Sequence, residues 1–222
     1  MLAPLHPTWQ SFASRNRAHL FLRDEQKRSP QGLRLNAGSA SRRFAVETLN
    51  LDLMQGSEVD IQADILELPL RSACVESIVC TGVLEHTKDP SRAVSELYRV
   101  LKPGGRAYFE VPFMQTLHAS PLDYYRWTPD GLTQLLRPFR ILDLRVTAGP
   151  ASALAWMFQE TMAMLLSFHS VLLYKIGLRI FGYLSVPISW MDALLERHPM
   201  AQQAASGFGV TALKSHGPAE GE

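Results

Sequence analysis

The sequence predicts an α/β fold built on one doubly wound, mostly parallel sheet. Three observations predict it. Short β-rich runs alternate with helical stretches between residues 33 and 146, an alternation that joins parallel strands through helical crossovers. The stretch 90–101 carries a clear amphipathic helical pattern. The chain has 222 residues, 46% of them hydrophobic, which is enough for the core of a single domain of the larger kind.

The elements follow in order along the chain. Residues 8–28 place spaced apolar side chains among many charges, which favours a capping helix that ends before Pro30 and Gly32. We expect strands near residues 33–37, 48–53, 59–63, 77–81, 106–111, 140–146 and 207–213. The helix 90–101 buries one apolar face, and Pro103-Gly104-Gly105 is expected to stop it.

Residues 151–195 are more apolar than the rest of the chain. Their longest uncharged run, Thr161–Tyr174, is too short to span a bilayer. We expect two or three helices, broken near Gly177 and Pro187 and inserted before the last strand. Packing as buried core helices is the favoured interpretation, and pairing with a second subunit or contact with a membrane are the alternatives.

Composition excludes several classes of protein. Lys and Arg total 22 against 21 Asp and Glu, and a net charge of +1 gives no field that would gather nucleic acid. The two cysteines, Cys74 and Cys80, lack the spacing of a disulfide framework or a zinc site. The first residues lack the pattern of a secretory signal. We therefore expect a cytoplasmic protein with reduced thiols and no bound metal.

A doubly wound sheet binds ligands beyond the carboxyl ends of its strands, and acids follow two of the expected strands. Gly38 ends the first in a tight turn, Asp52 ends the second and Asp64 ends the third. An acid at such a place can accept hydrogen bonds from ribose hydroxyls or from an adenine amino group. Alone, Gly38 also suits a turn made for packing, and Asp52 a solvated turn or a helix cap.

Two further groups of residues are expected to face the same crevice. Thr81 and Gly82 follow the fourth strand, and His86 comes soon after as a base or a pocket wall. The polar and aromatic run after the fifth strand suits a lid, in which substrate is oriented or a proton accepted by His118, Asp123, Tyr125 and Arg126. The structural alternative is that Asp123 and Arg126 pair on a helical turn while Tyr124 and Trp127 pack inward.

At these residues the sequence resembles the class I S-adenosylmethionine-dependent methyltransferases, particularly their type 11 group. The resemblance covers roughly residues 33–146, and its last two motifs are fairly specific for the family. The matching motifs are, in order, Asn36-Ala37-Gly38-Ser39, Asp52, Ala63-Asp64-Ile65 followed by Leu68-Pro69, Val83-Leu84-Glu85-His86, and Leu101-Lys102-Pro103-Gly104-Gly105.

The resemblance implies a Rossmann-like sheet of seven strands whose last strand is antiparallel. It implies S-adenosylmethionine as the cofactor, with the turn from Asn36 to Ser39 at the methionine moiety, Asp52 at the ribose, and Asp64 with Ile65 at the adenine. The remaining residues of the expected cofactor site are Leu53, Thr81, Gly82 and His86. We expect one methyltransferase-like domain over residues 1–222. Its parts are a capping helix (1–30), a cofactor-binding core (31–147), an apolar helical insert (148–205), the last strand (206–214) and a frayed tail (215–222).

The expected function is methyl transfer from S-adenosylmethionine to a small-molecule acceptor, or to one linked to a lipid or glycan. Positioning does most of the work in this reaction, and where a base is needed His118 and then His86 are the candidates. One alternative is a binding protein with weakened turnover, because Ala37 and Ala40 stand where the family carries further glycines. The other is a docking module that contacts a membrane or forms a homodimer through residues 151–195.

Overall fold

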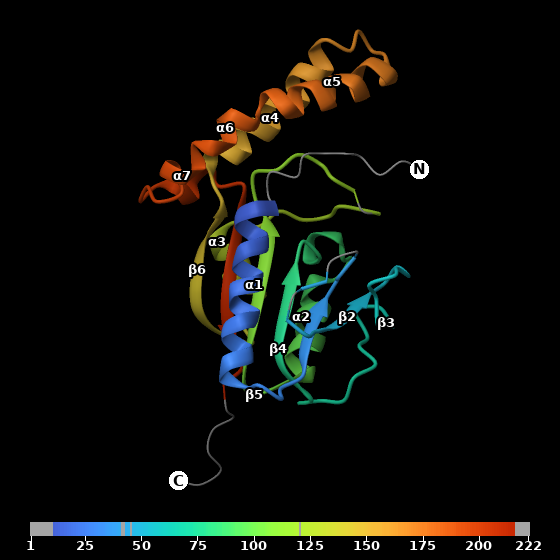
Figure 1. Ribbon diagram of the computed structural model, residues 1–222, viewed down its shortest axis with the longest axis vertical. Coiled ribbons are helices and arrows are strands. Elements are labelled where there is room, and N and C mark those ends of the chain that lie inside the picture. The colour runs from blue at the N-terminus through green and yellow to red at the C-terminus, as the bar shows by residue number, and fades with distance from the viewer. Residues whose placement is uncertain (1–10, 41–42, 45, 120, 216–222) are drawn as a thin grey trace. The chain divides into compact units, whose positions relative to one another are not determined.

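A computed structural model describes residues 11–40, 43–44, 46–119 and 121–215 of the chain. Seven strands form one sheet in the order β3-β2-β1-β4-β5-β7-β6, with β7 antiparallel (Figure 1). This is the Rossmann-like arrangement that the sequence predicts, so the expected fold class is confirmed. The strands are β1 (Arg34–Ala37), β2 (Leu49–Asp52), β3 (Ile61–Gln62), β4 (Val75–Thr81), β5 (Leu101–Pro112), β6 (Arg140–Ala148) and β7 (Gly207–Leu213).

The helices lie between these strands and before the last of them. The α-helices are α1 (Ser11–Arg28), α2 (Pro90–Val100), α3 (Pro129–Leu135), α4 (Pro150–Leu165), α5 (Val171–Leu184), α6 (Val186–Trp190) and α7 (Asp192–Leu195). Two short 3-10 helices are η1 (Leu84–His86) and η2 (Ala201–Ala204). The first residues of the expected capping helix, 8–10, and the tail from residue 216 lie outside the described residues.

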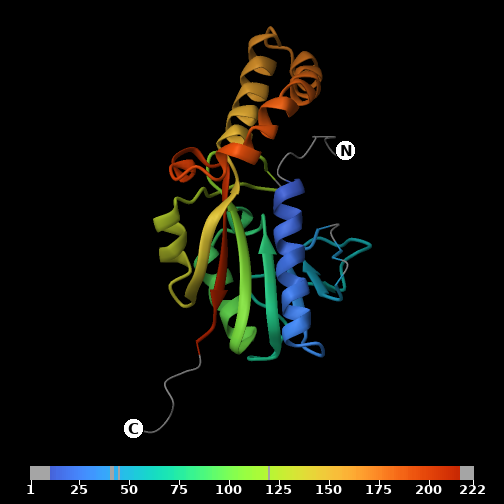
Figure 2. The same cartoon turned by 60° about the vertical axis from the view of Figure 1, so that its left-hand side comes forward.

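The chain forms two compact units. The sheet unit comprises Asn16–Val111, Ala119–Arg145 and Gly209–Glu222, and the helical unit comprises Met1–Arg15, Pro112–His118 and Val146–Phe208. Figure 2 shows the helices of the second unit as a group of their own. The predicted motifs of the cofactor site fall in the sheet unit, whereas the apolar insert falls in the helical unit.

Helices cover both faces of the central strands in the sheet unit (Figure 1). On one face, Phe21 of α1 stacks on Tyr108 of β5 with 5.8 Å between ring centroids, within a buried cluster that includes Leu22 and Val79. On the other face, α2 buries the apolar stripe that the sequence predicts. Its first turn is capped by the Asp89 carboxylate, which accepts from the backbone N–H of Arg92 at 2.9 Å. The central strands are therefore packed between α1 and α2, and these contacts fix the positions of the strand ends.

The predicted helix 90–101 is confirmed to within one residue, but Pro103-Gly104-Gly105 do not form the connection that follows it. The helix ends at Val100 and β5 begins at the next residue, so these three residues lie inside the strand. Gly104 takes a positive φ of 75°, and its N–H donates to the carbonyl of Lys214 at 2.7 Å. A partner more than a hundred residues away thus draws this segment into the sheet.

The predicted break near Gly177 is also wrong, because this glycine lies inside α5. A Cβ atom at Gly177 would stand 3.1 Å from the Cα of Ala163, so the glycine serves close packing of α5 on α4. The turn between these helices falls at Phe168 and His169, both of which take positive φ. Pro187 does lie at a break, in the first turn of α6. The insert therefore contains four helices, α4 to α7, where two or three were expected.

A single buried carboxylate caps the N-terminus of α4. The residue before this helix is Gly149, which has no side chain with which to cap it. Asp192 of α7 takes that role from 40 residues away, accepting from the backbone N–H groups of Ala151 at 2.8 Å and Ser152 at 2.9 Å. It also accepts from the N–H of Gly149 at 3.2 Å and from the Ser152 hydroxyl at 2.5 Å. Asp192 thereby ties the two ends of the insert together.

Candidate functional site

The carboxyl ends of four neighbouring strands meet at one edge of the sheet unit. In the parallel register, Ala37 of β1 lies opposite Leu51 of β2 on one side and Cys80 of β4 on the other. Asp52 at the end of β2 lies opposite Gln62 of β3. The residues that follow these ends, where the sequence predicts the cofactor site, are therefore neighbours in space.

The glycine turn after β1 is tightly packed. Gly38 takes a positive φ of 73°, and its N–H donates to the carbonyl of Leu51 at 2.8 Å. A Cβ atom at this position would lie 2.1 Å from the Cγ2 of Val83, in the loop after β4. Both the backbone conformation and the neighbour therefore require glycine.

Asp52 holds the glycine turn directly. One carboxylate oxygen accepts from the backbone N–H of Ala40 at 2.7 Å, and the other accepts from that of Met54 at 2.8 Å. The side chain is partly exposed at the edge of the sheet. Ala40 itself has a positive φ of 46°, which costs a non-glycine residue about 1–2 kcal/mol. The first two motifs of the predicted site are thus one hydrogen-bonded unit.

The third motif lies beside the second. The N–H of Ala63 donates to the carbonyl of Asp52 at 2.9 Å, which places Asp64 next to the end of β2. The Asp64 carboxylate is exposed and accepts from the N–H of Leu66 at 2.9 Å, while Ile65 turns inward and is buried. Leu53, by contrast, is 55% exposed. An exposed leucine next to two carboxylates offers an apolar surface for an aromatic ring.

An ion pair between the buried Glu96 and the partly exposed Arg99 supports the loop that carries Asp64. Glu96 of α2 is buried, and its carboxylate accepts from the N–H of Leu68 at 2.9 Å and from Arg99 at 2.8 Å. Arg99 in turn donates to the carbonyls of Leu68 at 3.0 Å and Leu70 at 2.8 Å. The sequence analysis missed this pair, although a glutamate and an arginine three residues apart on the polar side of α2 are a detectable signal.

Glu96→Gln is expected to lower the free energy of unfolding by about 1–3 kcal/mol, because charge-assisted hydrogen bonds are lost. The hydrogen bond from Arg99 holds the pKa of Glu96 below its ordinary value. The ionised Glu96 carboxylate therefore stabilises the fold at pH values above the pKa that it has in the unfolded chain. This stabilisation is lost as the pH falls through the pKa of Glu96 in the folded protein. Urea denaturation of wild type and Glu96→Gln should show a difference in the free energy of unfolding that becomes smaller at acid pH. The exposed neighbour Glu67, changed to Gln, is the control, and a difference independent of pH would contradict this role.

The loop after β4 presents backbone and one imidazole. Gly82 has a positive φ of 66°, and a Cβ built there would meet nothing nearer than a carboxylate oxygen of Glu85 at 3.6 Å, so a ligand can approach this backbone. His86 lies in η1, and its Nδ1 is 2.6 Å from the carbonyl oxygen of Leu122. Since a carbonyl only accepts, Nδ1 carries the hydrogen, and Nε2 of the neutral ring is the basic nitrogen.

The segment after residue 119 contacts this loop within the sheet unit. The N–H of Tyr124 donates to the carbonyl of Glu85 at 2.7 Å, and the Tyr125 hydroxyl donates to that of Lys88 at 3.1 Å. Arg126 pairs with Asp123 in a two-pronged contact, with 2.7 Å between Nη2 and Oδ2. The structural alternative expects this pair, but it places the pair on a helical turn, whereas residues 122–128 form no helix. Trp127 is buried as that alternative also expects, whereas Tyr124 is 41% exposed.

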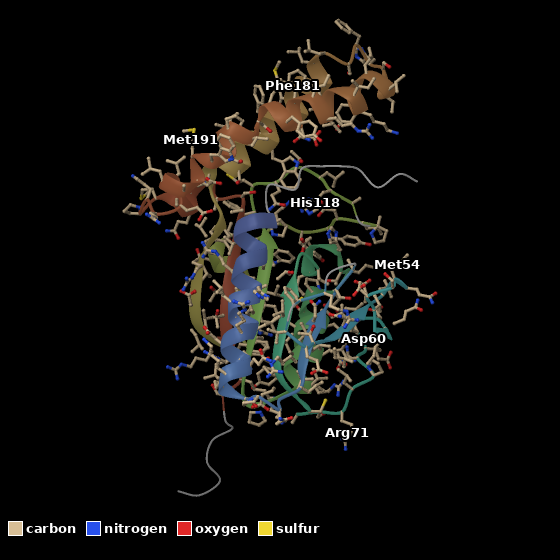
Figure 3. The ribbon with its side chains drawn as sticks, in the orientation of Figure 1. Met54, Asp60, Arg71, His118, Phe181 and Met191 are labelled. Carbon is tan, nitrogen blue, oxygen red and sulfur yellow. The ribbon has the colours of Figure 1, made fainter. Side chains whose placement is uncertain are left out.

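His118, the first-named base, belongs to the helical unit. Its ring lies 5.6 Å from the Trp156 ring of α4, and its Nδ1 is 3.0 Å from the carbonyl of Thr116 (Figure 3). The catalytic roles of His118, Asp123, Tyr125 and Arg126 stay predictions.

The remaining predicted residues of the turn differ in what they offer a ligand. The Asn36 side chain is buried and donates to Asn50 at 2.9 Å across β1 and β2, so it serves the sheet. Ala37 is fully buried. The Ser39 hydroxyl is also buried, and it has no hydrogen-bond partner among the residues that the structure describes. An unsatisfied buried hydroxyl beside Gly38 fits a site completed by a polar ligand.

A cavity of about 540 Å³ opens elsewhere in the sheet unit. Its lining includes Gly32, Arg34, Arg43 and Asp60, which precede β1, β2 and β3 or begin them. It therefore lies toward the amino ends of the strands, away from the predicted residues, and chemistry of the doubly wound fold is found at the opposite edge. Figure 3 labels Asp60 on this side and Met54 beyond the end of β2.

Comparison with known proteins shows which family the central part of the chain matches. Residues 38–109, from the glycine turn into β5, match the family described as "Methyltransferase domain", type 11. Residues 38–109 therefore match the class I S-adenosylmethionine-dependent methyltransferases. S-adenosylmethionine is the methyl donor typical of this family, as the sequence predicts. The open backbone at Gly82, the unsatisfied Ser39 hydroxyl and the carboxylate of Asp52 are consistent with such a ligand.

Curated methyltransferases resemble parts of the chain. The ubiquinone/menaquinone biosynthesis C-methyltransferase UbiE of Acidiphilium cryptum is 33% identical over 97 residues, which are 43% of this chain and 35% of that protein. A probable S-adenosylmethionine-dependent methyltransferase of Mycolicibacterium smegmatis is 48% identical over 48 residues, or 21% of this chain and 19% of that one. The chain thus spans about a third or less of the length of these relatives.

A solved methyltransferase shares the fold over nearly the whole chain. The 1,6-didemethyltoxoflavin-N1-methyltransferase of Burkholderia thailandensis superposes with a TM-score of 0.57 at 15% identity, over 95% of this chain and 82% of that one. At such identity the likeness concerns the fold alone.

Proposed function

We propose that this protein transfers the methyl group of S-adenosylmethionine to a small-molecule acceptor. One observation carries the proposal. The Asp52 carboxylate lies at the carboxyl end of β2 and accepts a hydrogen bond from the N–H of Ala40 in the glycine turn. Because β1 pairs with β2, this carboxylate and the turn after β1 lie together at the carboxyl edge of the sheet. A nucleoside with a charged amino-acid tail requires hydrogen-bonding groups of these kinds close together.

Each motif has a distinct role in the proposed site. Asp52 would accept from the ribose hydroxyls and Asp64 from the adenine amino group, while the exposed Leu53 would contact a face of the ring. Ile65, predicted to cover the ring, is buried and packs beneath this loop instead. The backbone from Gly38, the Ser39 hydroxyl and the backbone of Thr81 and Gly82 would hold the methionine part. When bound, S-adenosylmethionine supplies a methyl group that its sulfonium charge already activates.

The protein's own contribution is then to orient the acceptor and remove a proton. In the sheet unit, Nε2 of His86 is a candidate base, because Nδ1 is held by the Leu122 carbonyl, and a carboxylate oxygen of Glu85 lies 3.9 Å from Nε2. The buried Cys80 is unsuited to proton transfer, since burial raises the pKa of its thiol far above the usual range. His118, the first candidate base from the sequence, stays a candidate, with Asp123, Tyr125 and Arg126 proposed to orient the acceptor.

For the acceptor we propose an apolar small molecule, including one linked to a lipid or glycan. The name of the UbiE relative points to quinone precursors, and the toxoflavin enzyme to a small heterocycle. The apolar helical insert of this chain supports the lipid-like end of this range. Methylation assays with quinol, phenol and isoprenoid-linked acceptors, using labelled donor, test this choice.

Asp52→Ala is expected to weaken binding of S-adenosylmethionine by about 1–3 kcal/mol, because charge-assisted hydrogen bonds to the ribose are lost. Isothermal titration of wild type and variant measures the change. Asp24→Ala, at an exposed acid of α1, is the matched control and should bind like wild type. Thermal melting of each protein separates lost affinity from lost folding. Unchanged affinity would refute the role of Asp52, and a wild type that binds no donor at millimolar concentration would refute the proposed function.

A further inference from the structure

The helical unit buries small and polar side chains, whereas its large apolar side chains are exposed. Among the buried residues of α4 are Ser152 and Gln159, and the carboxylate of Glu160 accepts a hydrogen bond from Tyr174 of α5 at 2.5 Å. The buried Asp192 adds a charge to the same interior. A soluble helical hairpin normally buries leucine and exposes such groups.

The outer surface of this unit is correspondingly apolar. Within α5, all of which is described, Gly182 alone is buried, so the favoured expectation of core helices is wrong for this helix. Helices α4 to α7 and the turn between α4 and α5 expose large apolar side chains, several of them by more than half. These are Leu154, Met157, Met164, Leu165, Leu166, Phe168, Val171, Leu172, Leu173, Ile176, Ile180, Tyr183, Leu184, Trp190, Met191 and Leu194.

Helical geometry separates two faces of α5. One face packs on α4, where the ring of Phe181 meets that of Phe158 at 6.1 Å and Gly177 contacts Ala163. Leu172, Ile176, Ile180 and Tyr183 follow one another at spacings of four and three residues, and all are exposed. They form a continuous apolar stripe on the outer side. We call this stripe the outer face of α5.

Positive charge borders the outer face. Lys175 and Arg179, four residues apart, are exposed beside the apolar stripe. Glu160 is the only acid between residues 150 and 190, and its carboxylate is engaged by Tyr174. Trp190, 70% exposed, and Tyr183 add aromatic rings of the kind that favour the boundary between lipid and water. The surface therefore presents apolar groups and cations with little negative charge.

The helices are too short to cross a bilayer singly. α5 has 14 residues, about 21 Å of helix, against a hydrocarbon core of about 30 Å. In the described part of the chain, no single helix has the length and hydropathy of a membrane span, and one pair, Val171–Leu184 with Val186–Leu195, has them only together across a 40° bend. An amphipathic surface of this size lies in the interface.

We propose that the outer face of α5, with Phe168 and Trp190, binds the surface of a bilayer that contains anionic lipid. The apolar stripe enters the boundary between headgroups and acyl chains, and Lys175 and Arg179 pair with lipid phosphates. The proposal does not depend on methyl transfer. The positive charge of Lys175 and Arg179 favours anionic lipid over a second copy of the chain, because two copies of this face would repel each other on pairing.

Sedimentation with vesicles tests the proposal on the full chain. Wild type should sediment with phosphatidylcholine vesicles containing a third phosphatidylglycerol, and far less with phosphatidylcholine alone or in high salt. The double variant Lys175→Glu/Arg179→Glu should bind at least about 30-fold more weakly, from roughly fivefold for each cation. Ile176→Glu/Ile180→Glu should bind at least tenfold more weakly. Leu20→Glu, at a leucine of α1 exposed to 57%, is the matched control and should behave as wild type.

Two measurements keep the outcome decisive. Thermal melting should show that these surface variants stay folded, and the emission of Trp190 should shift to the blue on adding anionic vesicles, a shift absent in Trp190→Phe. If wild type does not sediment with anionic vesicles, the proposal is overturned. A stable dimer in light scattering that the Ile176→Glu/Ile180→Glu variant dissociates, without vesicle binding, would overturn it as well, since the face would then pair with a second copy.

Discussion

Gly38→Ala is expected to abolish measurable binding of S-adenosylmethionine and to lower the free energy of unfolding by about 2–5 kcal/mol. Two costs add. A positive φ of 73° costs alanine about 1–2 kcal/mol. The new Cβ would lie 2.1 Å from the Cγ2 of Val83, and relieving such overpacking costs about 1–3 kcal/mol more. Any relief moves the turn that Asp52 holds through Ala40, and with it the proposed binding edge.

A second substitution separates these costs. Val83→Ala in the Gly38→Ala background removes the nearest atoms, so part of the stability should return while the backbone strain persists. Gly56→Ala is the control, because the nearest neighbour of its Cβ is 3.5 Å away at ordinary contact distance. Urea denaturation and isothermal titration measure both properties. A Gly38→Ala protein with wild-type stability and affinity would contradict the packing described here.

Asp192→Ala is expected to destabilise the helical unit by about 3–5 kcal/mol. The substitution leaves the buried N–H groups of Ala151, Ser152 and Gly149 without their acceptor, and each unsatisfied buried group costs about 1–3 kcal/mol. It also removes the only side-chain cap of α4, because Gly149 offers none. Asp192→Asn keeps one acceptor oxygen and should lose about half as much.

Hydrogen exchange is the measurement suited to this prediction, since it reports local opening. Amides in the first turns of α4 should lose protection in Asp192→Ala, whereas those of β4 in the sheet unit should change least. Equal protection in α4 and β4 would mean that the two units unfold together. Unchanged protection in α4 would remove the role given to Asp192.

The positions of the strands along the chain could be predicted from the sequence because the signals for them are local. The first four β-rich runs end at or beside a glycine or an acid, and the strand predicted at 207–213 coincides with β7. Asp52 could be placed at a strand end for the same reason. Its hydrogen bonds to Ala40 and Met54 could not, because they depend on how the turn closes in space.

Glycine shows the limit of local signals. The pattern at Gly177 is that of a helix break, yet the residue lies within α5 because Ala163 of another helix needs the space. Gly104 likewise resembles a helix stop, but the distant Lys214 carbonyl draws it into β5. In both cases the partner lies outside the helix or strand that holds the glycine, so the residues next to the glycine do not contain the information.

From the amino-acid sequence alone come the fold class, the resemblance of the central part of the chain to a methyltransferase family, and the residues placed at the strand ends, since periodicity and short motifs encode them within a few residues. Tertiary structure alone reveals the cap that Asp192 gives to α4, the support that Glu96 and Arg99 give to the Asp64 loop, and the outward apolar face of α5. These features arise from contacts between segments far apart in the chain, and burial is a property of the assembled surface.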